Sequence, residues 1–220
     1  MEVKEIFRGV FKVNGKLATR NLARGRRVYD EDLVEIGGEE YRLWNPYRSK
    51  LAAAVINGLR NLSIREGAKV LYLGAATGTT SSHVSDIVGG SGVVYCIEIS
   101  ERSLRELVKV CEARPNLLPM LHDARNVDEY AGDVEPCDVL YQDIAARDQS
   151  EILRRNSRLL KRGGLAYAAI KSQSIDVAKD PQAVYRAFLD EVSDTFEVLE
   201  KIDIAPYSKM HLFVVLKKKA

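Results

Sequence analysis

The chain has 220 residues, of which 46% are hydrophobic and 29% charged, and its formal net charge is +2. This composition excludes an intrinsically disordered chain, and the length suffices for one full core with a small additional domain. No apolar stretch approaches the roughly 20 residues that cross a bilayer, and the first residues lack the pattern of a secretory signal, so we expect a cytoplasmic protein without a membrane partner.

Residues 1–48 differ in pattern from the rest of the chain. Apolar and polar residues alternate from Val3 to Val13, and turn sequences stand at Asn14-Gly15 and Gly37-Gly38. Short strands joined by such turns are typical of antiparallel hairpins. We therefore expect a small β-rich domain over residues 1–48 and a second domain over residues 49–220.

Six basic residues fall within this segment with no acidic residue among them: Lys12, Lys16, Arg20, Arg24, Arg26 and Arg27. Such a run suits a phosphate backbone, but the acidic stretch that follows it, from Asp30 to Glu35, balances it just as well as a solvated surface. The aromatic connector with Tyr41, Trp44 and Tyr47 also leaves two roles open, packing between the domains or stacking on a nucleobase.

From Ser49 onwards, helices and strands alternate. Ser49 is a good N-cap, and the apolar residues after it predict a helix to about Leu62. The expected strands are residues 69–73, 93–97, 117–121, 139–142, 165–170, 196–202 and 210–216, and the expected helices are 81–88, 101–112, 150–161 and 181–192. This alternation is typical of an α/β fold with a doubly wound, Rossmann-like parallel sheet. Since no helix separates the last two strands, we expect them to pair antiparallel, with the final strand running against its neighbours.

The three cysteines give no sign of a disulfide framework or a metal centre. Cys96, Cys111 and Cys137 are odd in number and far apart, and they form neither a Cys-x-x-Cys motif nor a Cys/His spacing typical of metal ligands. We predict reduced, mostly buried cysteines and no metal.

The strand predicted at residues 69–73 is the element beside which we place the function. It ends at a glycine turn, Gly74-x-x-x-Gly78, which lets a ligand approach the backbone at the start of the next helix. Small molecules bind beyond the carboxyl ends of strands in open α/β sheets, and Glu98 ends the next strand, where a carboxylate accepts ribose hydroxyl protons. An ordinary strand-to-helix turn and a solvated glutamate are the alternatives.

Four ionisable residues are predicted to meet at this edge of the sheet. Asp143 and Lys171 end the fourth and fifth strands. His211 begins the reversed last strand, and Lys50 begins the helix that precedes the first strand. Taken singly, they also fit a helix cap, two solvated lysines and an inert histidine. Together, beside a cleft, they suit the activation of an alcohol, because a lysine beside other cations loses its proton more easily.

Longer motifs around these residues resemble the fibrillarin family. They are Asn45-Pro-Tyr-Arg-Ser-Lys-Leu-Ala-Ala-Ala, Leu73-Gly-Ala-Ala-Thr-Gly-Thr-Thr-Ser-Ser-His-Val-Ser-Asp, Tyr141-Gln-Asp-Ile-Ala and Tyr207-Ser-Lys-Met-His. The resemblance extends over essentially all 220 residues. The chain departs from the family's pattern at two places: Ala76 stands where a serine is common, and Ile144-Ala145-Ala146 stands where Val-Ala-Gln is common. Since the glycine-arginine-rich extension of eukaryotic fibrillarins is missing, the chain is similar to the archaeal form.

This resemblance implies an enzyme with a methyltransferase sheet that moves the methyl group of S-adenosylmethionine to ribose 2′-hydroxyls of rRNA, its precursors and tRNA. The family's catalytic tetrad falls on Lys50, Asp143, Lys171 and His211. The implied cofactor-binding residues are Thr79 and Thr80 after the glycine turn, Glu98 and Ile99 at the ribose, Asp123 and Ala124 at the adenine, and Asp143, Ile144, Ala145 and Ala146 near the methionine end.

The implied setting is a C/D box ribonucleoprotein. In it, a guide RNA selects the target RNA by base pairing, and a Nop-domain scaffold protein and a ribosomal-type kink-turn-binding protein complete the particle. Three other functions are weighed against this one. Base methylation usually relies on an Asn/Asp-Pro-Pro-Tyr-type loop, which Asp143-Ile-Ala-Ala does not match. Protein glutamine methylation fits the sequence, whereas the intact tetrad argues against a purely structural subunit.

Overall fold

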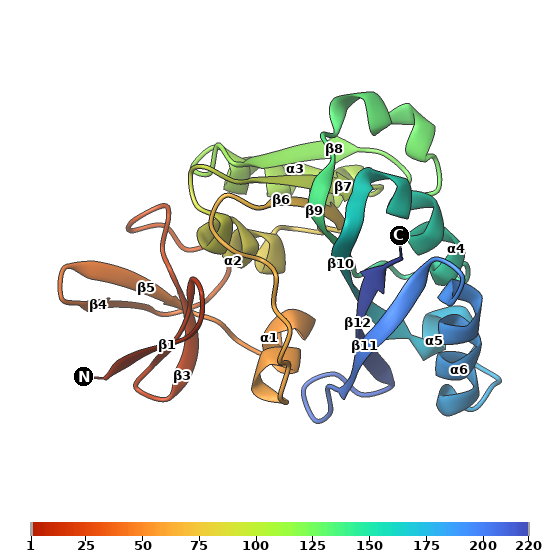
Figure 1. The fold of residues 1–220 in the computed structure, drawn as a ribbon. Helices are drawn as coiled ribbons and strands as arrows, with labels where there is room; N and C mark the ends of the chain where they lie inside the picture. Colours follow the sequence, from red (N-terminus) through yellow and green to blue (C-terminus); the bar gives the residue numbers. More distant parts are fainter. Residues whose placement is uncertain (1, 220) are drawn as a thin grey trace.

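The computed structural model describes residues 2–219, which form two β-sheets, with helices between the sheets and on the outer face of the larger sheet (Figure 1). The N-terminal sheet has five antiparallel strands in the order β1-β2-β3-β5-β4. Their bounds are β1 Val3–Phe7, β2 Val10–Val13, β3 Lys16–Arg20, β4 Leu33–Ile36 and β5 Glu39–Leu43. The predicted turns at Asn14-Gly15 and Gly37-Gly38 are tight hairpin turns, since all four residues have the positive φ that two-residue turns of this kind require.

The second sheet has seven strands in the order β11-β12-β10-β9-β6-β7-β8. The strands are β6 Lys69–Leu73, β7 Val93–Glu98, β8 Leu117–Leu121, β9 Cys137–Gln142, β10 Leu160–Lys171, β11 Phe196–Asp203 and β12 His211–Lys218. β6 to β10 pair in parallel, and β12 pairs antiparallel with both β10 and β11. The predicted doubly wound sheet with a reversed last strand is therefore confirmed. The chain order reverses at β6, which has β7 on one side and β9 on the other.

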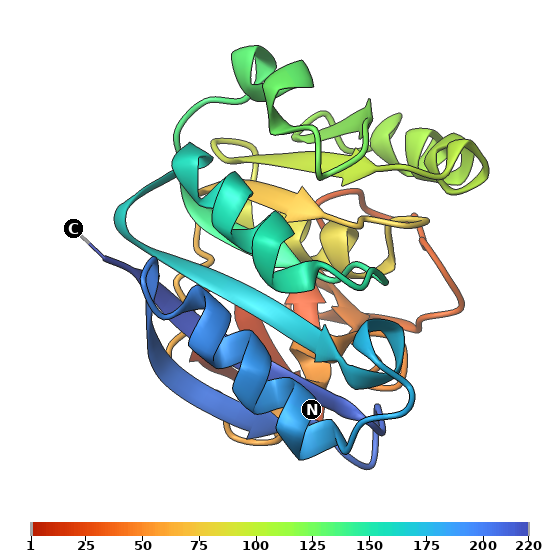
Figure 2. The same cartoon turned by 90° about the vertical axis from the view of Figure 1, so that its right-hand side faces the viewer.

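Helices cover both faces of this sheet, and strand residues alternate between them. The helices are α1 Lys50–Ile56, α2 Thr79–Val88, α3 Glu101–Cys111, α4 Gln149–Asn156, α5 Ser172–Ile175 and α6 Pro181–Val192, with short 3₁₀ turns η1 Val127–Glu129, η2 Ala131–Asp133 and η3 Ser157–Leu159. Along β6, Val70 and Tyr72 pack with α1, α2 and α3, whereas Leu71 and Leu73 pack toward α4 and α6. Figure 2 shows α4 and α6 lying across one face of the sheet.

Two helices end earlier than the sequence predicts. α1 stops at Ile56 rather than near Leu62, because Asn57 caps it and Gly58 turns the chain with φ +100°. The helix expected at residues 150–161 ends at Asn156, and a 3₁₀ turn leads directly into β10 at Leu160. β10 thus begins five residues before the predicted strand at 165, with an irregular register between Leu160 and Leu165.

Buried charges join the N-terminal sheet to helix α2. Arg42 of β5 is fully buried and lies 2.7 Å from Glu31 and 2.8 Å from Asp86 of α2. Arg114, which follows α3, contacts the other oxygen of Asp86. Because each buried charge has an opposite charge beside it, the cluster escapes the cost of isolated buried ions. It fixes α2, and with it the turn at Gly74, against the N-terminal sheet.

Cys96 and Cys137 are buried, Cys111 is partly buried, and all three are free thiols, as predicted. Within residues 2–219, no helix combines the length and apolar character that crossing a membrane requires.

Candidate functional site

The site begins at the turn where β6 ends. Gly74 has φ +80°, and a Cβ atom there would lie 2.8 Å from the backbone carbonyl of Asp143. Glycine is therefore needed both for the conformation and for the close approach of the chain that leaves β9. Gly78, with φ +95°, then caps α2. The switch point between β6 and β9 thus brings Asp143 directly against the glycine turn.

Two lysines meet the carboxylate of Asp143. Lys50, at the first turn of α1, and Lys171, at the end of β10, lie 3.0 Å and 2.7 Å from Asp143 Oδ1. Lys50 donates a 3.0 Å hydrogen bond to Oδ2, and Lys171 donates a 2.9 Å bond to the Asp143 backbone carbonyl. Oδ1 is buried and has no well-aligned hydrogen bond, so its contact with Lys171 is an ion pair without a directed bond. All three side chains are mostly buried.

His211 completes the group from the reversed strand. It lies opposite Lys171 in the antiparallel ladder of β10 and β12. Its Nδ1 is 2.7 Å from the Lys209 carbonyl, which can only accept, so Nδ1 carries the proton and Nε2 keeps its lone pair in the neutral ring. Burial lowers the pKa of His211, and the charges of Lys50 and Lys171 lower it further. The four predicted residues therefore do converge, with a neutral histidine among them.

A cleft of about 280 Å³ lies beside this group, along the carboxyl ends of β6, β7, β8 and β9. Eight predicted cofactor residues line it: Glu98, Ile99, Asp123, Ala124, Asp143, Ile144, Ala145 and Ala146. Glu98 is only 8% exposed, and its two oxygens accept the backbone N–H groups of Ala76 and Ser100 at 2.7 and 2.8 Å. The carboxylate is thus fixed at the strand end while each oxygen keeps a free lone pair.

The two predicted threonines lie at the edge of this arrangement. Thr79 and Thr80 open α2, but neither lines the cleft. The Thr80 hydroxyl is buried and donates to the hydroxyl of Ser49, whose own oxygen caps α1 by accepting the Ala52 N–H. In this structure Thr80 therefore supports the start of α1, where Lys50 lies. Its role in cofactor binding stays a prediction.

Other residues of the site escaped the sequence analysis. Gln149 is buried, donates to the Ala146 carbonyl and accepts the backbone N–H of Lys171, so it ties the loop after β9 to the end of β10. Arg125 lines the cleft and donates from its Nε and Nη2 to the two carboxylate oxygens of Asp148. A polar residue directly after the Asp143 loop was the signal for Gln149, but its partners are set by tertiary structure alone.

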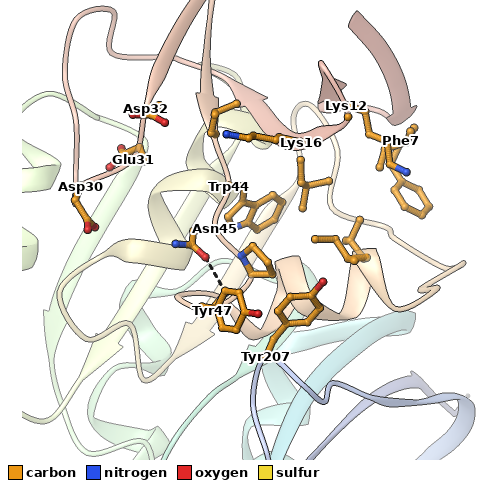
Figure 3. Close-up of a pocket in the computed structure, with 17 residues that line it drawn as sticks. Phe7, Lys12, Lys16, Asp30, Glu31, Asp32, Trp44, Asn45, Tyr47 and Tyr207 are labelled. Carbon is orange, nitrogen blue, oxygen red and sulfur yellow. Dashed lines mark hydrogen bonds between the residues drawn. The ribbon is translucent and has the colours of Figure 1, made fainter. Parts of the chain in front are cut away.

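A larger groove of about 800 Å³ lies away from these residues, between the N-terminal sheet and α1 (Figure 3). Its rim carries Lys12 and Lys16 together with Asp30 and Asp32. Tyr47 is 67% exposed and lies edge-on to Tyr207. The centroids of the two rings are 5.0 Å apart, and the angle between the ring planes is 74°. This groove carries charges of both signs, but none of the predicted catalytic or cofactor-binding residues lines it, so we place the chemistry at the smaller cleft.

The structure bears on the two interpretations given for the basic run, phosphate binding or a solvated surface, and on those given for the aromatic connector, packing between domains or stacking on a nucleobase. Trp44 is buried and stacks on His83 of α2, so this ring packs between the sheets, whereas Tyr41 is buried in the apolar cluster of the N-terminal sheet itself, edge-on to Phe11. Arg20 and Arg24 pair with Glu39 and Glu35 of the same sheet. The contacts of these two arginines thus favour a solvated surface on which basic and acidic charges balance.

Comparison with known proteins gives one consistent result. The sequence model of a protein family described as fibrillarin matches residues 1–220. The fibrillarin-like rRNA/tRNA 2′-O-methyltransferase of Pyrococcus furiosus is 49% identical over 98% of this chain and 97% of its own.

Two solved structures extend the similarity to three dimensions. The Aeropyrum pernix fibrillarin with natively bound S-adenosyl-L-methionine has a TM-score of 0.88 at 41% identity, covering 98% of this chain and 99% of that one. A fibrillarin in complex with Nop5p has a TM-score of 0.89 at 36% identity, covering 98% of this chain and 100% of that one.

Proposed function

Because the chain belongs to the fibrillarin family, we propose that it transfers the methyl group of S-adenosylmethionine to ribose 2′-hydroxyls of rRNA and tRNA. The observation that carries this proposal is the meeting of Lys50, Asp143 and Lys171 at the mouth of the cleft, with polar contacts of 2.7 to 3.0 Å. An alcohol must lose a proton as it attacks a methyl group, and here a lysine that lines the cleft lies together with the groups that orient it.

The cleft fits S-adenosylmethionine by the chemistry of its lining. Glu98, held by two backbone N–H groups, suits the two ribose hydroxyls, since it can accept from both without losing its own bonds. Asp123 and Ala124 stand on the wall predicted for the adenine, and Ile144 to Ala146 on the wall predicted for the methionine part. The bound cofactor supplies a methyl group that its sulfonium already activates.

We assign Lys171 as the acceptor of the 2′-hydroxyl proton. Asp143 holds both lysines, but of the two it is Lys171 that lines the cleft, so Lys171 is the one within reach of a bound hydroxyl. A neutral Lys171 amine would keep its N–H bond to the Asp143 carbonyl and direct its lone pair at the hydroxyl. Lys50 and Asp143 therefore position the base rather than touch the proton.

His211 is assigned to orient the target nucleotide. With its proton on Nδ1, the ring offers Nε2 as a hydrogen-bond acceptor on the side away from Lys209. The low pKa of the ring keeps this acceptor free at neutral pH. Alignment of the hydroxyl with the methyl group is the main contribution that such a site can make, because the reaction needs neither metal nor covalent intermediate.

The proposal includes a particle and a cellular setting. A similar fibrillarin was solved in complex with Nop5p, and we propose that this chain likewise binds a Nop-domain scaffold protein. We further propose a C/D box guide RNA that selects the target, a kink-turn-binding protein as third subunit, and action in the archaeal cytoplasm. As part of the same proposal, residues 1–48 form one domain and residues 49–220 the methyltransferase domain.

Transfer of a labelled methyl group tests the function. The full chain would be assembled with scaffold protein, kink-turn protein and guide RNA, and the modified atom in a target RNA would be mapped. We expect methylation of one 2′-oxygen, which moves by one nucleotide when the guide sequence is shifted by one position. A target with a 2′-deoxyribose at that nucleotide is the matched control and should stay unlabelled. Label on a base or on a glutamine, or no label despite cofactor binding, would overturn the proposal.

A further inference from the structure

The cofactor cleft lies between two loops that follow non-adjacent strands of the sheet. One loop, residues 122–126, follows β8, and the other, residues 143–148, follows β9. In the sheet, β6 and β7 stand between β9 and β8. Three strand spacings of about 4.8 Å therefore separate the strand ends, roughly 14 Å in all. Side chains that reach across this gap can hold the two loops at one distance.

Arg125 makes such a connection. From the loop after β8, its Nε and Nη2 donate to the two oxygens of Asp148 at 2.8 and 2.9 Å. Its Nη1 also lies 3.2 Å from the carboxylate of Asp123. A guanidinium that holds a carboxylate with two parallel bonds has one preferred orientation, which makes it a rigid link.

Asp148 gives up a local role for this contact. It is the N-cap residue of α4, where an aspartate normally accepts a backbone N–H of its own helix, yet its side chain makes no capping bond. Its carboxylate turns instead to Arg125 in the opposite loop. A residue that breaks the local rule is expected at a functional position. The same pair lowers the pKa of Asp148, chiefly through its hydrogen bonds with Arg125.

We propose that the Arg125–Asp148 pair is a clamp that sets the distance between the adenine-side and methionine-side walls of the cofactor cleft. Arg125 also orients Asp123, which accepts the Arg125 backbone N–H at 2.9 Å, toward the position predicted for the adenine. The pair positions the walls and takes no part in proton transfer. This inference rests on the proposed function, because it assumes that the cleft holds S-adenosylmethionine.

A binding experiment separates this role from that of an ordinary surface ion pair. The dissociation constant of S-adenosylmethionine would be measured by calorimetry for the full chain and for Arg125→Gln, Asp148→Asn and the double variant. Since both side chains are partly exposed, the pair itself should contribute little to folding, and the melting temperature should barely change. The dissociation constant should rise about three- to tenfold, because the two walls of the cleft then lack this link and must be brought to the right distance on binding.

The double variant and one control complete the test. If the two residues act as one clamp, the double variant should bind no more weakly than either single variant. Arg158→Gln removes a comparable exposed pair, with Asp128, and should leave cofactor affinity unchanged. In the assembled particle, Arg125→Gln should raise KM for the cofactor while kcat at saturation stays the same.

Two different failures can be told apart. The clamp would be overturned, and the proposed function left intact, if the unaltered chain binds the cofactor tightly and the Arg125→Gln and Asp148→Asn variants bind it with the same affinity as the unaltered chain. Fully additive losses in the double variant would overturn it too. Absence of binding by the unaltered chain would overturn the proposed function, and the clamp with it. Arg125→Lys keeps the charge without the two-pronged geometry and should show an intermediate affinity if the clamp operates.

Discussion

Lys171 contacts Asp143 at two points: its Nζ lies 2.7 Å from carboxylate oxygen Oδ1 and donates a 2.9 Å hydrogen bond to the backbone carbonyl. The end of β10 is thereby fixed to the end of β9 at the atom proposed to take the proton. A flexible lysine side chain is held in one place, which is the condition for a base that acts on a single hydroxyl.

Replacing this lysine should separate binding from catalysis. Lys171→Ala is expected to reduce methyl transfer by at least about 100-fold, as for loss of a general base, while the dissociation constant of S-adenosylmethionine changes by less than about threefold. Lys171→Arg keeps a cation but cannot serve as a base, because a guanidinium does not lose its proton in proteins. Single-turnover methylation in the assembled particle would measure both effects. Retained turnover in the arginine variant would contradict the assignment.

The convergence of the tetrad could be predicted because it depends on topology alone. Asp143 and Lys171 end parallel strands, and a reversed strand necessarily starts at the same edge, which places His211 there. Ser49 could be identified as a helix cap because capping is a local property, and it does cap α1. Helix ends were harder to predict: Leu59 and Leu62 continue the helical spacing of apolar residues after Ile56, but Gly58 turns the chain away.

Contacts between distant segments left no trace in the local pattern. The Arg125–Asp148 pair joins residues 23 positions apart, and Arg42 meets Asp86 across 44 positions. In the sequence these are ordinary charged residues. Only the packing of the N-terminal sheet on α2 buries Arg42 completely and shows why an ion pair is needed there.

The close approach at Gly74 leads to a second prediction. Gly74→Ala would place a methyl group 2.8 Å from the Asp143 carbonyl and from a carbon of Ile144, in a residue with φ +80°. The left-handed conformation alone costs an alanine about 1–2 kcal/mol, and the clash adds to this by pushing back the Asp143 loop.

Stability and cofactor binding should therefore fall together in the Gly74→Ala variant. For a chain of this size, about 1–2 kcal/mol corresponds to a drop of roughly 2–8 °C in melting temperature. Gly132→Ala is the matched control, since no atom lies within 4 Å of its added methyl group. Calorimetry with and without S-adenosylmethionine would measure both properties. An unchanged cofactor affinity in Gly74→Ala would show that the position of Asp143 is not limited by this turn.

The histidine buried between the sheets leads to the last prediction, a pH dependence of stability. His83 Nε2 accepts from the Tyr29 hydroxyl, and its Nδ1 donates to Thr19, whose hydroxyl donates to Asp86, each at 2.7 Å. This series of hydrogen bonds requires a neutral imidazole ring. Burial lowers the pKa of His83 well below its usual value, and the charges of Arg42 and Arg114 lower it further.

The sign of the effect follows from proton binding. Below about pH 6.5 the unfolded chain binds a proton at His83 that the folded protein does not bind. The free energy of unfolding should therefore fall by about 1.4 kcal/mol for each unit by which the pH is lowered. This loss continues until the pH reaches the lowered pKa of the folded state. Chemical denaturation of the full chain between pH 5 and pH 7.5 would measure it, with His83→Gln expected to be less stable at pH 7.5 but less sensitive to acid. Tyr29→Phe removes only the donor to Nε2 and should keep the acid sensitivity. If His83→Gln shows the same slope as the unaltered chain, the acid sensitivity originates in other groups and the buried imidazole is not its cause.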